Sequence, residues 1–112
     1  MGIKNKFLAA AACVCALAIA PVALGAGVTV KVTPTHQKEG KKVEMLVTGM
    51  KPNERVKAHE VAPNGQTRNL YPRAGHTGAL LVRVTAQVKG KHVWTFTGRS
   101  SHRKGKGSYI VT

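Results

Sequence analysis

The chain beyond residue 26 is a series of short runs in which apolar, often β-branched residues occupy every second position. Gly, Pro and Asn interrupt these runs, and no window keeps a sustained helical period. Alternation of this kind predicts strands with one buried face, and the interrupting residues predict the turns between them. The pattern therefore predicts an all-β fold.

Seven runs qualify as strands, at residues 28–32, 42–49, 55–61, 66–71, 79–88, 92–98 and 108–112. Asn64-Gly65 is the strongest turn signal, because tight hairpin turns need a positive φ that these residues accept. Lys89-Gly90 predicts a second turn. Short strands with a turn signal every 8–12 residues or so are typical of a small β-sandwich.

One face of these strands is apolar and predicts the core. Val28, Val30 and Val32 share a face of the first strand. The remaining core positions, from four further runs, are Val43, Met45, Val47, Val56, Ala58, Leu80, Val82, Val84, Trp94 and Phe96. The chain of 112 residues has room for one domain. Because only 4% of its residues are aromatic, we expect the stability of the fold to be ordinary to modest.

The first 25 residues predict a secretory signal peptide. Lys4 and Lys6 precede an apolar run at 7–20, Pro21 ends it, and small residues follow up to Gly25. The alternative is a membrane anchor, but the run is short beside the ~20 residues that a spanning helix needs. We therefore expect cleavage after Gly25 or Ala26 and a mature domain at 26–112.

Export has two consequences. Both cysteines, Cys13 and Cys15, lie in the predicted signal peptide, so the mature domain has no thiol or disulfide. We expect a periplasmic, cell-surface or secreted protein with no transmembrane span after processing.

The charge of the chain is strongly positive and unevenly distributed. The formal net charge is +14, and loss of Lys4 and Lys6 leaves +12 on the mature chain. Residues 61–112 contain nine Lys and Arg and no acid, and there is no Asp anywhere. A Ser-His-Asp triad and an Asp-rich calcium loop are thereby excluded, and a polyanionic partner is favoured.

A set of motifs follows the predicted strands in order. Val30-Lys31-Val32 leads to Pro34, residues 47–56 read VTGMKPNERV, residues 63–65 read PNG, residues 90–98 read GKHVWTFTG, and Tyr109-Ile110-Val111 closes the chain. This series resembles the immunoglobulin-like modules of bacterial secreted and surface proteins. The resemblance implies a β-sandwich with a binding or structural role and no catalytic residues.

The segment at 99–106, RSSHRKGK, is the densest cluster of bases. We expect a mobile, donor-rich loop suited to phosphate, sulfate or carboxylate groups, with the turn lysines adding to the same surface. The alternative is a solubilising loop whose like charges discourage edge pairing. The predicted anion- or partner-binding residues are Lys89, Lys91, Arg99, His102, Arg103, Lys104 and Lys106.

Metal binding and nucleophilic catalysis are the two other chemistries that the side chains suggest. The five histidines, His36, His59, His76, His92 and His102, are expected to be exposed surface residues rather than a metal site, since no two lie closer than ten residues. Ser100-Ser101-His102 places hydroxyls beside an imidazole, but neither an Asp nor a glycine elbow accompanies it. We therefore expect neither an enzyme nor a cofactor.

The sequence thus predicts an exported, non-catalytic binding or accessory domain that docks electrostatically. An anionic envelope polymer, membrane headgroups or an acidic protein would be the partner, and extracellular nucleic acid would bind non-specifically. The alternative is a structural subunit of a surface assembly that donates the strand at 28–32 to a neighbour. A metal-buffering protein using the histidines is the third hypothesis.

Overall fold

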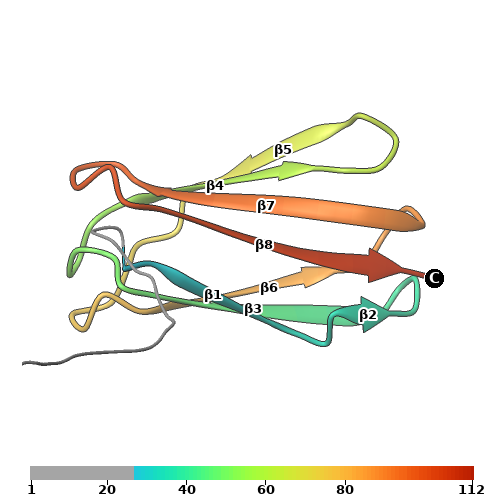
Figure 1. Cartoon of the computed structure of the whole chain (residues 1–112), viewed down its shortest axis with the longest axis horizontal. Coiled ribbons are helices and arrows are strands. Elements are labelled where there is room, and N and C mark those ends of the chain that lie inside the picture. The colour runs from blue at the N-terminus through green and yellow to red at the C-terminus, as the bar shows by residue number, and fades with distance from the viewer. Residues whose placement is uncertain (1–26) are drawn as a thin grey trace, which may run out of the picture.

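A computed structural model describes residues 27–112, so the predicted signal peptide and both cysteines lie outside the described residues. The described chain is all-β (Figure 1). Across residues 27–112 there is no helix, and hence none long and apolar enough to cross a membrane. The eight strands are β1 (Thr29–Thr33), β2 (His36–Gln37), β3 (Lys42–Thr48), β4 (Val56–Val61), β5 (Thr67–Leu70), β6 (Leu80–Thr85), β7 (Gly90–Gly98) and β8 (Lys104–Val111).

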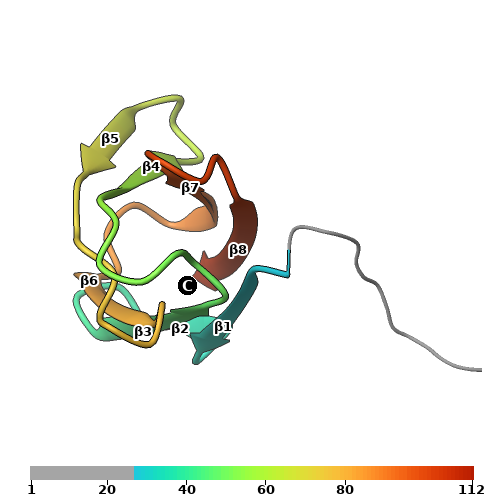
Figure 2. The same cartoon turned by 90° about the vertical axis from the view of Figure 1, so that its left-hand side faces the viewer.

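The strands form two sheets that face one another (Figure 2). One sheet has the order β1-β3-β6 and the other the order β2-β8-β7-β4-β5. The chain passes from the first sheet to the second through Pro34, and β2 then pairs with β8 in parallel. With β1, β3 and β6 in the places of strands A, B and E, and β8, β7 and β4 in those of G, F and C, the sandwich is immunoglobulin-like.

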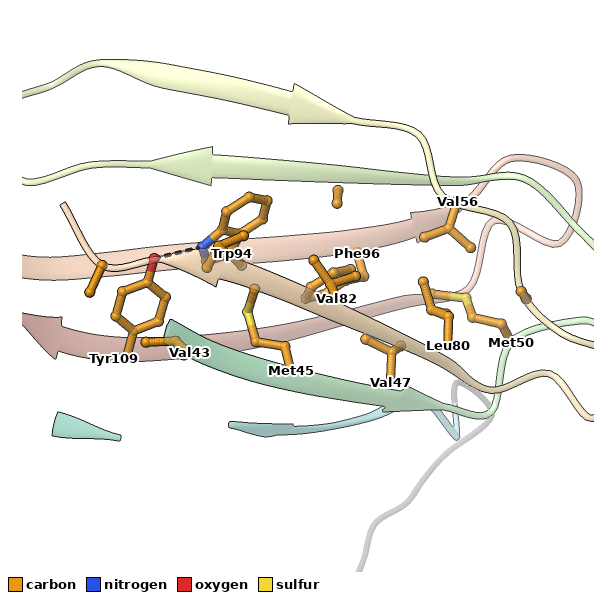
Figure 3. Close-up of a cluster of buried hydrophobic side chains, with 14 of the residues drawn as sticks. Val43, Met45, Val47, Met50, Val56, Leu80, Val82, Trp94, Phe96 and Tyr109 are labelled. Carbon is orange, nitrogen blue, oxygen red and sulfur yellow. Dashed lines mark hydrogen bonds between the residues drawn. The ribbon is translucent and has the colours of Figure 1, made fainter. Parts of the chain in front are cut away.

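The core lies between the sheets and uses the predicted faces (Figure 3). Trp94 and Phe96 on β7 are fully buried, and Val43, Met45 and Val47 on β3 pack opposite them. The predicted faces of β4 and β6 are buried as well. Met50, Ala74, Ala86, Tyr109 and Val111 complete a cluster that the alternation alone had only partly indicated.

Several strand boundaries differ from the sequence prediction. The loop expected at 99–107 ends early, because β8 begins at Lys104 and its first residues pair with β7 through Gly107. Lys and Gly are poor strand formers, but tertiary pairing outweighs intrinsic propensity. β7 begins at Gly90 and β6 ends at Thr85, and the short β2 exists only through its pairing with Ile110 and Val111.

Glycines on β8 let β1 close one side of the sandwich. Gly105 and Gly107 face inward while Lys104 and Lys106 face outward. A Cβ at Gly105 would lie 2.5 Å from a methyl of Val28, and one at Gly107 would lie 2.6 Å from a methyl of Val30. The Lys-Gly repeat therefore has a structural reason: its glycines receive the half-buried valines of the first strand.

This close approach predicts the effect of substitution. We expect Gly107→Val to lower the free energy of unfolding by about 1–3 kcal/mol, because an overpacked side chain must displace β1. The matched control is Lys106→Val, which introduces the same side chain on the outward face, where we expect little change. Urea unfolding of both variants would measure this, and equal stability of the two would contradict the packing of β1 on β8.

Candidate basic face and its polar neighbours

The outer face of the five-stranded sheet carries a group of exposed lysines. Lys57 projects from β4, Lys91 from β7, and Lys104 and Lys106 from β8. Lys104 lies opposite Thr97, which in turn lies opposite Lys57, so these two lysines flank a threonine in one cross-strand row. We call the four lysines and the sheet surface between them the basic face.

No acid of the described chain lies on the basic face. Glu54 and Glu60 are each only 6% exposed. Glu44 stands on the opposite sheet, where Arg83 Nε donates to it at 2.8 Å, and Glu39 lies in the connection between β2 and β3. The positive potential of the face is therefore uncompensated by neighbouring side chains, although the chain has four glutamates.

The basic face also offers uncharged contact surface. Val61 is 43% exposed and Ile110 is 38% exposed, and both side chains point outward from the sheet. Lys91 and Lys106 border an open hollow of ≈ 230 Å³ that Val93, Gly107 and Ser108 complete. The face thus combines ammonium groups with threonine hydroxyls and small apolar areas.

The structure divides the predicted binding residues into three places. Lys91, Lys104 and Lys106 belong to the basic face, whereas Arg99, His102 and Arg103 lie in the loop between β7 and β8. Lys89 precedes β7 and Arg99 follows it, so a strand about 30 Å long separates them. The expectation that the turn lysines and the whole 99–106 segment form one surface is correct only for the three lysines on the sheet. Lys57, which the sequence prediction had omitted, joins them.

The loop between β7 and β8 is held by a buried carboxylate rather than left mobile. Glu54 accepts five hydrogen bonds: from the amide of Lys51, and from the amides and hydroxyls of Ser100 and Ser101, at 2.7–3.2 Å. Arg103 also donates to the carbonyl of Gly49 at 2.9 Å. The Ser-His sequence at 100–102 therefore has its hydroxyls directed to Glu54, where they stabilise the loop.

This hydrogen-bonded environment changes the acidity of Glu54. Burial alone raises the pKa of a carboxyl, but here the donors of Ser101, Lys51 and Ser100 outweigh it. They lower the pKa of Glu54 from its ordinary value of 4.5 to about 2. Ionised Glu54 thus stabilises the folded state above pH 4.5, and this contribution is lost as the pH falls toward 2.

We expect Glu54→Gln to lower the free energy of unfolding at neutral pH by up to about 3 kcal/mol, the equivalent of that pKa shift. The difference from the unsubstituted protein should shrink between pH 5 and pH 2 or so, because Glu54 loses its charge there. Urea unfolding over this range measures it. The exposed Glu39→Gln is the matched control, and a pH-independent difference for Glu54→Gln would contradict the assignment.

A second buried carboxylate organises the other end of the sandwich. Glu60 on β4 accepts from Arg68 Nε of β5 at 3.2 Å, from His92 Nδ1 of β7 at 2.8 Å and from the Tyr109 hydroxyl of β8 at 3.2 Å. Trp94 Nε1 lies 3.4 Å from the same hydroxyl (Figure 3). Burial raises the pKa of Tyr109, and Glu60 adds to this while the bond from Trp94 opposes it, so the hydroxyl keeps its proton for Glu60.

His92 contradicts the expectation that all the histidines are exposed, because it is only 3% exposed. Its Nδ1 faces Glu60, and its Nε2 lies 2.6 Å from the carbonyl of Val88. Both ring nitrogens therefore face oxygen atoms, and these two contacts hold the imidazole ring in place between β4 and the turn before β7. Val88 itself has φ of +65°, a conformation rare for a β-branched residue, and the bond to His92 helps to hold it there.

The sequence contained a signal for this cluster that the prediction did not use. Glu60 continues the inward face of Val56 and Ala58, and His92 continues that of Trp94 and Phe96. A charged residue on an otherwise apolar strand face predicts a buried partner of opposite charge. Alternation thus points to both residues, although it does not reveal that they meet.

A polar pocket adjoins this cluster at the side of the sandwich where β5 and β6 are not paired. Its volume is ≈ 240 Å³, and its lining residues are Glu60, Ala62, Gln66, Thr67, Arg68, Thr85, Gln87, Val88 and His92. The guanidinium carbon of Arg68 lies 5.3 Å from the ring centre of Trp94, so stacking holds this arginine between the core and the pocket. We call this site the Arg68 pocket.

Neither site brings together a recognisable metal-binding group. Among residues 27–112 there is no cluster of three or more His, Cys, Asp or Glu side chains suited to holding a metal ion. The Nδ1 atom of His59 instead lies 2.7 Å from Oδ1 of Asn69, across the hairpin of β4 and β5. The metal-buffering hypothesis receives no support from the placement of these histidines.

The comparisons with known proteins establish the fold. No protein-family model and no curated protein matches the sequence. Among solved structures, macromomycin is similar with a TM-score of 0.60 and 12% identity, over 77% of this chain and 100% of that chain. At this identity the likeness shows a shared β-sandwich and nothing of the function.

Two further solved structures are more distant. The soluble domain of PmoD from Methylocystis sp. ATCC 49242 (Rockwell) has a TM-score of 0.49 and 13% identity, over 76% of this chain and 90% of that chain. The CARDB domain of the PF1109 protein from Pyrococcus furiosus has a TM-score of 0.44 and 17% identity, over 75% of this chain and 91% of that chain.

Proposed function

We propose that this chain is an exported, non-catalytic domain that docks through its basic face onto an anionic polymer of the cell envelope. The observation that carries the proposal is the group of four exposed lysines on one sheet surface that lacks any acid among the described residues. Membrane headgroups and acidic proteins present the same kind of charge and are the alternative partners.

The rigidity of the basic face favours a repeating partner. Lys104 and Lys106 stand two residues apart on β8, which places their Cα atoms about 7 Å apart. Lys57 lies two strands away in the same row as Lys104, at about 10 Å. Because the strands hold these positions, a polymer with regularly spaced anionic groups contacts several lysines at little cost in backbone entropy.

The side chains suited to catalysis support a non-catalytic role. Ser100 and Ser101 direct their hydroxyls to Glu54. His92, beside a carboxylate, has both ring nitrogens engaged and is nearly inaccessible. The group that accepts from both hydroxyls is Glu54, whose pKa is lowered to about 2, so it is a weak general base, which favours binding over acyl transfer.

Charge reversal on the basic face tests the proposal. We expect Lys104→Glu combined with Lys106→Glu to raise the Kd for a sulfated-polysaccharide matrix about 10- to 100-fold, given roughly 1 kcal/mol per basic residue at an anionic surface. Lys31→Glu with Lys42→Glu is the matched control, because it makes the same charge change on exposed positions of the three-stranded sheet. Affinity of the unsubstituted protein should fall steeply with added salt.

Equal loss of affinity in both double variants, or binding unaffected by salt, would refute a role for the basic face. Phosphatidylglycerol vesicles and a polyglutamate matrix, tested alongside, would identify the partner as a headgroup surface or an acidic protein if either binds more tightly than the polysaccharide.

A structural subunit of a surface assembly is the second candidate, and the three-stranded sheet favours it. No described strand pairs with the free edge of β6, and Leu46 and Leu81 form an adjacent exposed pair, 41% and 49% exposed, on the outer face of that sheet. β1, the strand proposed for donation, pairs with β3 of its own chain from Thr29 to Thr33. Donation would therefore require β1 to leave this pairing.

Sizing chromatography with light scattering separates the two candidates. A docking domain is expected to remain a monomer as its concentration rises, whereas an assembly subunit should form larger species. If larger species do form, Leu81→Ser should suppress them, and a matched change at Val61 on the other sheet should not. A monomer at all concentrations would count against assembly.

A further inference from the structure

The Arg68 pocket has the features of a binding site that the basic face does not explain. We propose that it binds a small carboxylate anion, held by the guanidinium of Arg68 and by the amide and hydroxyl donors around it. The pocket opens beside β5 and β6, whereas the lysines of the basic face project from the outer surface of the five-stranded sheet. The inference therefore stands independently of the proposed function.

The charges at the pocket favour an anion. Arg68 brings one positive charge to the lining, and Glu60 is already engaged by Arg68 Nε, His92 Nδ1 and the Tyr109 hydroxyl. The Nζ of Lys42 lies 3.0 Å from the hydroxyl oxygen of Thr85, a lining residue, and brings a second positive charge next to the lining. Glu60 is the single acid in the lining.

Three side chains of the lining, Glu60, Gln66 and Thr85, have acceptor oxygens that are already engaged. Both oxygens of Glu60 already accept hydrogen bonds, so the carboxylate has little capacity left for a cation. Gln66 Oε1 accepts from Asn64, and Thr85 Oγ1 accepts from Lys42, which leaves the Gln66 amide N–H groups and the Thr85 hydroxyl proton to donate. An occupant with oxygen acceptors satisfies these groups.

Arg68 has donor groups that suit a planar anion. Its Nε is engaged by Glu60 and its guanidinium stacks on Trp94, and no protein partner of its two terminal nitrogens occurs among the described residues. Two parallel N–H donors on a planar group match the two oxygens of a carboxylate. A volume of ≈ 240 Å³ is below the range of about 300–1,000 Å³ of drug-sized pockets, so the occupant is a small acid or a single carboxylate of a larger chain.

Trp94 provides a direct readout, because it is the one tryptophan in the chain and lies against Arg68. The protein would be titrated with acetate in a cationic buffer, with chloride as the salt that keeps the ionic strength constant. We expect a saturable change in tryptophan emission with a Kd on the order of 1–10 mM, as befits a ligand of four non-hydrogen atoms. Inorganic phosphate as a second probe should bind more weakly than acetate if planar recognition holds.

Gln87→Glu is the decisive variant, because it places a carboxylate in the lining and leaves Glu60, His92 and Arg68 unchanged. We expect it to raise the acetate Kd at least tenfold. Thr29→Glu, an exposed change of the same charge on β1, is the matched control and should change the Kd less than twofold. Arg68→Gln should abolish the response, with Arg83→Gln as its control.

The proposal is overturned if acetate causes no saturable change beyond that of chloride, or if Gln87→Glu binds acetate as tightly as Thr29→Glu does. Phosphate binding more tightly than acetate would also overturn the assignment to a carboxylate. Because the titration involves no polyanionic matrix, each of these outcomes leaves the proposed docking through the basic face untouched.

Discussion

The buried carboxylate of Glu60 is the interaction on which the arrangement of the five-stranded sheet depends. A carboxylate that is 6% exposed must be matched by donors, and Glu60 receives them from β5, β7 and β8 while it stands on β4. The Glu60 carboxylate thereby links β4 to β5, β7 and β8 and fixes the register in which these strands pair. The same contact directs Arg68 across Trp94 and leaves the Arg68 pocket beside it.

Burial of two of the four glutamates also determines the charge that the surface presents to a binding partner. Glu54 accepts hydrogen bonds from the loop between β7 and β8, and Glu60 lies in the interior of the sandwich. Neither carboxylate therefore neutralises the charge of the exposed lysines. The strand pairing then gathers Lys57 from the first half of the chain with three lysines from the second half. A nearly uniform positive face thus arises from where the acids lie as much as from how many bases there are.

Much of the fold was predictable because strand alternation is a local signal. It placed Val43, Met45, Val47, Trp94 and Phe96 in the core, and the structure confirms them as buried. It failed where tertiary pairing decides the outcome. The Lys-Gly repeat at 104–107 has no strand propensity of its own and is a strand because β7 pairs with it and β1 packs on its glycines. The candidate binding residues were predicted as one cluster, yet β7 separates Lys89 from Arg99.

The sequence alone determined the all-β class, the apolar faces of the strands and the acid-poor second half, since all of these are properties of neighbouring residues. Only the tertiary structure decided which side chains meet. The contact between Glu60 and His92 spans 32 residues, and that between Glu54 and Ser101 spans 47. Such contacts depend on strand order and register, which follow from the packing of the whole sandwich rather than from any local pattern.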